Sequence, residues 1–225
     1  MPENNKKRQA PRTFQWSIFP AVMGLAVLAS WWLMHTGMEP SLAILGPQFA
    51  AIIIVAVFEH VYPYHQIWNQ SRGDISVDAR YAIMIGVLAA LITPPIVSLG
   101  VAVGGWLSDQ YGMGLWPTEW PLVLQIALVM IIGELPGYWI HRAEHEWEGL
   151  WRFHAVHHSA PRLYWLNAAR FHPIDYLLTT APAYLLLVTL GCGEVMLAYF
   201  GIVTTIHGIF QHANLQLRLG PLNYI

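Results

Sequence analysis

The sequence predicts an all-α protein: a multi-span transmembrane helical bundle that carries a histidine-rich helical metal site on its cytoplasmic side. Two observations lead to this fold class. Of the 225 residues, 56% are hydrophobic and 11% are charged, whereas soluble domains carry about 25% charged residues. In addition, five of the eleven histidines fall within residues 141–158, directly after a long apolar segment.

Six apolar runs divide the chain. They cover residues 16–35, 42–61, 81–107, 121–140, 176–191 and 195–210. Each of the first four is long enough to cross a bilayer core of about 30 Å, so four transmembrane spans are expected within residues 16–140. Pro94 and Pro95 lie inside the third run and are expected to kink or break it. That run is therefore interpreted as one broken helix or as two half-helices.

The last two runs are shorter, and a Gly-Cys-Gly sequence at residues 191–193 separates them. They predict either a short membrane hairpin at residues 176–210 or two short spans. Residues 141–225 are therefore expected to form a histidine-rich region with this hairpin inside it.

The positive charges test this layout. All eleven Lys and Arg residues fall in alternate polar segments, namely residues 1–15, 62–80, 141–175 and 211–225. The intervening loops contain none. Because cytoplasmic loops are enriched in Lys and Arg, we expect an integral membrane protein whose N-terminus and histidine-rich region both lie in the cytoplasm.

Residues 1–15 form a cytoplasmic leader, and its first twelve residues are polar, charged and expected to be disordered. The apolar stretch from Trp16 to Met34 is longer than the core of a cleaved signal peptide, so it is expected to be a retained helix. A net charge of −2 argues against a nucleic-acid partner. The one cysteine, Cys192, rules out an internal disulfide.

The histidines at 141–158 form two groups with helical spacing. His141 and His145 are four residues apart, and His154, His157 and His158 occupy positions i, i+3 and i+4. Each group would share one helix face. Because neutral imidazole is a common metal ligand, the two groups together predict one metal site.

His207 and His212 follow the predicted hairpin. A spacing of five does not keep two residues on one helix face, so either the helix is distorted or only one of them binds metal. His172 is open to three interpretations: a ligand, a residue that orients a ligand, or a loop residue capped by Asp175.

Three residues are candidates to hold a ligating imidazole by its second nitrogen: Glu134, His172 and Asn214. Glu134 lies seven residues before His141, two turns back on the same face, where a carboxylate near the membrane interior is costly. Asn167, like Asn214, could either orient a ligand or bind a lipid headgroup. The carboxylates of Glu144, Glu146 and Glu148 are expected on a solvated face.

The motifs resemble a known family. HxxxH is followed by HxxHH, with YWIHR before the first box, RFHP after the second, and QHAN at residues 211–214. This text, mainly residues 134–175, resembles the fatty acid hydroxylase/sterol desaturase superfamily. The resemblance implies a membrane enzyme that holds two irons in a cytoplasmic histidine site and uses O2 and electrons to hydroxylate or desaturate lipids.

The same resemblance implies a set of metal ligands. They are His141, His145, His154, His157, His158 and His212, and less directly His207. The family pattern closes with another HxxHH soon after the third group, and residues 213–225 contain none. We therefore expect the gene product to continue beyond residue 225, or ligands to have been lost. In either case these residues alone would offer an incomplete site.

The leading hypothesis is thus a membrane-bound diiron oxygenase. It would hydroxylate, in preference to desaturating, a fatty acyl, sterol-like or isoprenoid chain, with two iron ions as cofactor and zinc as a substitute. Its partners would be a membrane lipid, O2 and a separate electron donor, because no cytochrome or flavin domain is recognisable. The alternatives are a zinc hydrolase or isomerase with Glu134 as general base, or an inactive metal-binding fragment.

The charge pattern generates a topology prediction. A reporter inserted at residue 160 should be cytoplasmic, because it follows the HxxHH group, and one at residue 114 should be on the opposite side of the membrane. Compartment-specific labelling of a single inserted cysteine checks this. Equal accessibility of both positions from the cytoplasm would contradict the layout.

Overall fold

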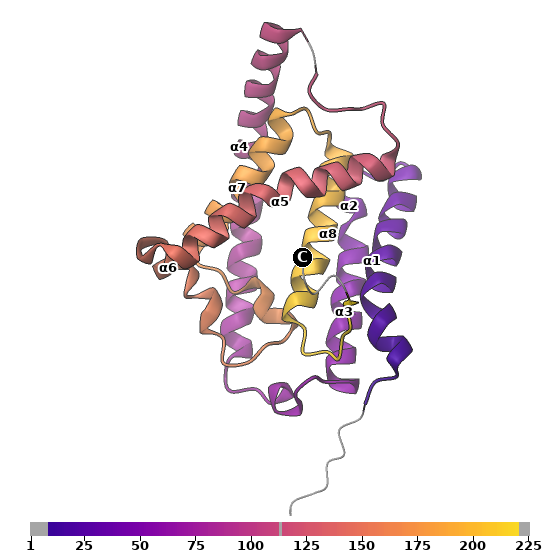
Figure 1. Cartoon of the computed structure of the whole chain (residues 1–225), viewed down its shortest axis with the longest axis vertical. Helices are drawn as coiled ribbons and strands as arrows, with labels where there is room; N and C mark the ends of the chain where they lie inside the picture. Colours follow the sequence, from indigo (N-terminus) through magenta and orange to yellow (C-terminus); the bar gives the residue numbers. More distant parts are fainter. Residues whose placement is uncertain (1–8, 113, 221–225) are drawn as a thin grey trace, which may run out of the picture. The chain divides into compact units, whose positions relative to one another are not determined.

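The computed structural model describes residues 9–112 and 114–220 (Figure 1). The α-helices of these residues are α1 (Arg12–His35), α2 (Pro40–Ala43), α3 (Leu45–Val61), α4 (Ile75–Tyr111), α5 (Leu122–Glu146), α6 (Glu148–His154), α7 (Pro173–Thr189) and α8 (Glu194–His212). Short 3-10 turns are η1 (Gln66–Asn69), η2 (His157–Ser159) and η3 (Trp165–Ala169). The described residues form no named strand, so the predicted all-α class is confirmed.

Five helical segments of the described residues are long and apolar enough to cross a membrane. They are α1, α2 with α3 (Pro40–Val61), α4, α5 and α8. The first four coincide with the four runs expected to span, and the multi-span membrane bundle is thus confirmed. The predicted hairpin region contains two helices, of which α7 has 17 residues and is shorter than the spans.

The N-terminal leader differs from its expected boundary. Helix α1 begins at Arg12, so its first turn lies inside the segment expected to be a leader. Residues 1–8 of that leader, with Lys6, Lys7 and Arg8, and residues 221–225 at the other end lie outside the described residues.

Helix α4 is continuous across Pro94 and Pro95, so the interpretation as two half-helices is wrong. Each proline removes one backbone N–H donor. The other backbone groups can form hydrogen bonds inside a membrane only within the helix, so the helix continues past the prolines. At about 1.5 Å per residue, 37 residues measure about 55 Å, which exceeds the bilayer core.

The chain divides into two compact units. Unit 1 comprises residues 1–75, 161–168 and 202–225, and unit 2 comprises residues 76–160 and 169–201. In unit 1, α1 packs against α2 and α3. The buried positions include Ile18, Val22 and Ala26 on α1 and Ala51, Val55 and Glu59 on α3. Residues four apart form one ridge of a helix. The buried ridge on α3 is apolar at Ala51 and Val55 and ends with the carboxylate of Glu59.

In unit 2, α5 packs on α7 and on α6 (Figure 1), and α4 approaches α7 through glycines. A Cβ atom at Gly104 would lie 2.7 Å from the carbonyl oxygen of Thr189, and one at Gly100 would lie 2.8 Å from Cβ of Val188. Small residues allow membrane helices to pack this closely. Gly105 has no neighbouring atom in the corresponding space.

These glycines give a matched pair of substitutions. Gly104→Ala should destabilise the protein by about 1–3 kcal/mol, because its methyl group meets backbone that cannot turn away. Gly105→Ala should be neutral or slightly stabilising, since alanine is the better helix former. Thermal unfolding of both variants in the same detergent measures the difference. Equal melting temperatures would show that α4 and α7 do not pack in this way.

Candidate metal centre

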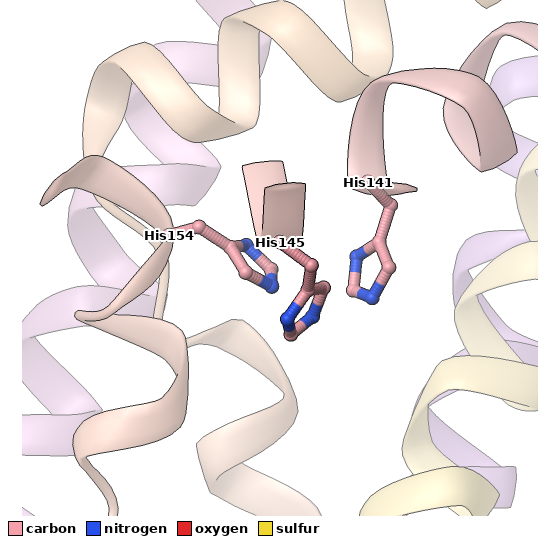
Figure 2. A group of neighbouring side chains, drawn as sticks. All are labelled: His141, His145 and His154. Atoms are coloured by element: carbon pink, nitrogen blue, oxygen red, sulfur yellow. The ribbon is translucent and has the colours of Figure 1, made fainter. Parts of the chain in front are cut away.

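Three histidines converge where α5 meets α6. His141 and His145 come from the last turns of α5, and His154 comes from the end of α6; Figure 2 shows their rings around a common centre. One nitrogen from each ring lies within 4.8 Å of the others. Helical spacing aligns the first two rings, as expected from HxxxH.

A single residue turns the chain between these helices. Trp147 ends α5 and begins α6 with extended backbone angles (φ −110°, ψ 116°), and its N–H still donates to the carbonyl of Ala143. The chain therefore reverses direction sharply enough for His154 to face the α5 histidines. The ring centroid of His154 lies 4.6 Å from that of His141 and 4.9 Å from that of His145.

The remaining two histidines of the second box join the same cluster through η2. The Nε2 atoms of His158 and His154 are 3.0 Å apart, and the His158 ring lies 4.9 Å from that of His145. Metal–imidazole bonds measure about 2.0–2.1 Å, so two adjacent ligands of one metal have nitrogens about 3 Å apart. The donor set thus fits a metal that prefers imidazole nitrogen, such as iron or zinc.

Asp175 holds the buried ring of His154 by a hydrogen bond to Nδ1, and Glu144 lies beside it. Nδ1 of His154 lies 3.3 Å from Oδ2 of Asp175 and 3.4 Å from Oε2 of Glu144, and all three side chains are fully buried. A carboxylate only accepts, so Nδ1 carries the proton and Nε2 carries the lone pair. This is the arrangement by which proteins orient metal-binding histidines.

His157 is held in the same manner by a backbone carbonyl. Its Nδ1 lies 3.2 Å from the carbonyl oxygen of Arg170, which again directs the lone pair to Nε2. The guanidinium of Arg170 donates to Asp78 on α4 at 2.6 Å, and also to Ser159 at 3.2 Å. The ion pair therefore fixes the segment that holds His157.

Burial favours the neutral form of two of these rings. Burial, together with the neighbouring histidines, first His141, which would carry like charges, lowers the pKa of His154 to about 3. Burial and His145 also lower the pKa of His158. A neutral imidazole is the form that binds a metal, so the lowered pKa values of His154 and His158 favour the metal-binding form of these two rings.

The structure corrects the expectation for Glu144. It was expected on a solvated face with Glu146 and Glu148, but it is fully buried while those two are exposed. The reason is tertiary: α5 packs on α7, which covers the face carrying Glu144. Glu134 is exposed on α5, so the carboxylates against His154 are Glu144 and Asp175 instead.

His172 has a different role in the structure. It is the N-cap of α7, and its Nδ1 accepts the N–H of Ile174 at 3.1 Å. An accepting Nδ1 places the proton of the neutral ring on Nε2, which makes the ring unsuited to bind a metal through Nε2. One sequence interpretation had Asp175 capping His172. In the structure His172 instead caps α7, the helix that carries Asp175.

The third group lies in unit 1, on α8. His212 has its Nδ1 3.0 Å from Oδ1 of Asn167. His207 is exposed, with its ring 6.2 Å from that of Phe19. Because α8 is a regular helix through both positions, they do not share a face. Asn214 is fully buried and bonds to His65 and Asn69.

The Arg170–Asp78 pair generates a prediction with an internal control. Their side chains are 8% and 0% exposed, so Arg170→Met leaves a buried, unpaired charge and should destabilise the protein by about 3–5 kcal/mol. Arg142→Met breaks a pair with Glu146 whose side chains are 52% and 56% exposed, so it should change stability little. Thermal unfolding in detergent compares them, and an equal effect would contradict the burial of the first pair.

A family of known proteins matches the part of the chain that carries these histidines. The family described as fatty acid hydroxylase matches residues 126–225, which contain every histidine discussed above from His141 onward. No solved structure matches the chain.

Two curated relatives extend the match. Ornithine lipid hydroxylase OlsE of Rhizobium tropici is 34% identical over 178 residues, which cover 78% of this chain and 54% of that protein. A putative Δ(7)-sterol-C5(6)-desaturase 2 of Arabidopsis thaliana is 27% identical over 130 residues, which cover 54% of this chain and 47% of that protein. The chain thus spans about half the length of these relatives.

Proposed function

Because the chain belongs to the fatty acid hydroxylase/sterol desaturase superfamily, we propose that it is a membrane oxidoreductase that hydroxylates a lipid. The observation that carries the proposal is the convergence of His141, His145 and His154, with His158 in contact, at the end of a membrane-spanning helix. A site at this depth lets a lipid chain approach without leaving apolar surroundings.

Two irons are the proposed cofactor. Their ligands would be His141, His145, His154, His157, His158 and His212, with His207 as a weaker candidate because it does not share a helix face with His212. Iron in such a site supplies the activation of O2. The reaction would insert one oxygen atom of O2 into a C–H bond and reduce the other to water, with two electrons from a separate donor and two protons from the solvent.

The protein's own residues would orient the histidine rings and keep water away from the histidine cluster. Asp175 and the carbonyl of Arg170 accept the Nδ1 protons of His154 and His157, respectively. Trp151 lies against the exposed side of the cluster, with its ring 5.6 Å from that of His158 and 5.5 Å from that of His145. We assign to it an apolar wall beside the position of the substrate.

The proposed substrate is the acyl chain of a polar lipid. The relative with the longer and more similar match is named as an ornithine lipid hydroxylase, and this favours acyl hydroxylation over sterol desaturation. Aromatic side chains suit a membrane–water interface, and Tyr138, Trp139 and Trp147 are exposed around the end of α5. Lipid headgroups would therefore lie near this level.

The zinc hydrolase is less well supported. It needs a carboxylate beside the metal to act as general base. Glu144 and Asp175 lie on the Nδ1 side of His154, away from the converging Nε2 atoms, and Glu134 is exposed. We further propose that the site faces the cytoplasm, since all eleven Lys and Arg residues fall in the segments placed there.

Iron content tests the proposal. Protein purified anaerobically from membranes should hold two irons per chain and consume O2 when supplied with a reductant and lipids that have saturated acyl chains. His157→Ala should lower iron affinity or activity by about 10–100-fold, because it removes a proposed ligand. The readouts are bound metal, O2 uptake and the mass of the lipid product, which should rise by one oxygen atom.

His35→Ala is the matched control. This histidine stacks on Trp31 at the end of α1, with ring centroids 5.3 Å apart, and should retain full iron and activity. Stoichiometric zinc without O2 uptake in the wild-type protein would refute the oxygenase and support the hydrolase.

A further inference from the structure

A buried carboxylate in unit 1 lies outside the chemistry described so far. Glu59 is 1% exposed and occupies the last turn of α3. Its Oε1 atom accepts two backbone N–H groups, from Trp165 and from Asn214, each at 2.8 Å. Burying a carboxylate costs more free energy than burying an apolar side chain of similar size. We therefore examine what its two hydrogen bonds hold in place.

These two amides flank one contact. Trp165 lies two residues before Asn167, and Asn214 lies two residues after His212. Asn167 and His212 are the pair joined by the 3.0 Å hydrogen bond between Oδ1 and Nδ1. One carboxylate oxygen therefore fixes the backbone on both sides of the imidazole–amide pair.

The orientation of the Asn167 amide determines the tautomer of His212. The NH2 group of Asn167 donates to the carbonyl oxygen of Arg162 at 2.5 Å, so its Oδ1 must be the atom that faces His212. An amide oxygen only accepts. Nδ1 of His212 therefore carries the proton, and Nε2 carries the lone pair, as in His154 and His157.

Further hydrogen bonds hold the carboxylate's own surroundings. The side chain of Asn214 accepts from the N–H of His65 at 2.9 Å and donates to Oδ1 of Asn69 at 2.8 Å. Asn69 in turn donates to the backbone carbonyl of Glu59 at 2.9 Å. The network closes on Glu59, so losing its Oε1 acceptor would release two segments that are far apart in sequence.

We propose that Glu59 is a positioning residue that, together with Asn167, presents Nε2 of His212 as a metal ligand. The inference rests on the proposed function, in which His212 binds iron. It adds a carboxylate from the second membrane span to the set of residues required for that ligand.

The test compares substitutions that keep or remove the acceptor. Glu59→Leu removes Oε1, whereas Glu59→Gln retains an oxygen at that position. Ile206→Ala is the control for general destabilisation, because Ile206 is fully buried on α8 and its side chain has no polar atom. Iron per chain, apparent iron affinity and melting temperature are measured for each. The ¹⁵N NMR signals of His212 are recorded in the metal-free protein.

We expect Glu59→Leu and His212→Ala each to weaken iron binding by about 10–100-fold, and the double variant to bind iron no more weakly than either single variant. The Nδ1–H tautomer signal of His212 should be lost in Glu59→Leu and kept in Glu59→Gln. If Glu59→Leu does not fold, Asn167→Leu, which removes the acceptor of the imidazole proton directly, should give the same two results.

Either of two results overturns the inference: wild-type iron affinity in the acceptor-free variants, or an equal loss of iron in Ile206→Ala at the same melting temperature. An unchanged His212 tautomer in those variants also refutes it, with or without metal. Failure of the proposed function looks different, since the wild-type protein itself would then bind no iron.

Discussion

The candidate ligand rings depend on one kind of interaction, the hydrogen bond from Nδ1 of an imidazole to an acceptor that cannot turn away. An imidazole has two tautomers and rotates about two side-chain bonds, so an unheld ring presents its lone pair in many directions. The Asp175 carboxylate, a backbone carbonyl and an amide oxygen hold His154, His157 and His212, respectively. Each acceptor selects the same tautomer, with the lone pair on Nε2.

The acceptors of His157 and His212 are themselves supported by buried ion pairs. Arg170 pairs with Asp78 through its side chain and accepts from His157 through its carbonyl. Arg162 has the same two roles in unit 1: its side chain pairs with Asp74, and its backbone carbonyl accepts a hydrogen bond from the side chain of Asn167. Because an arginine with a buried partner is costly to displace, its backbone is a firm support for a ligand.

Local patterns predicted the elements well. Apolar run length gave the positions of α1, α3, α4 and α5, since a membrane span must be long and apolar. Helical spacing put His141 and His145 on one face, and they lie together in the structure. The burial of Glu144 and Glu59 could not be read in this way, because it depends on which helix packs against each carboxylate. Nor could the capping role of His172, which depends on its backbone angles.

Trp147 has a consequence for how a metal would be captured. The histidines of α5 and α6 are joined by this one non-helical residue, so binding to the first pair would not require a long loop to order before the next ring arrives. Tethering of this kind raises the effective concentration of the later ligands. The cluster therefore resembles a preorganised chelator, in which most of the entropy cost of gathering donors is met during folding.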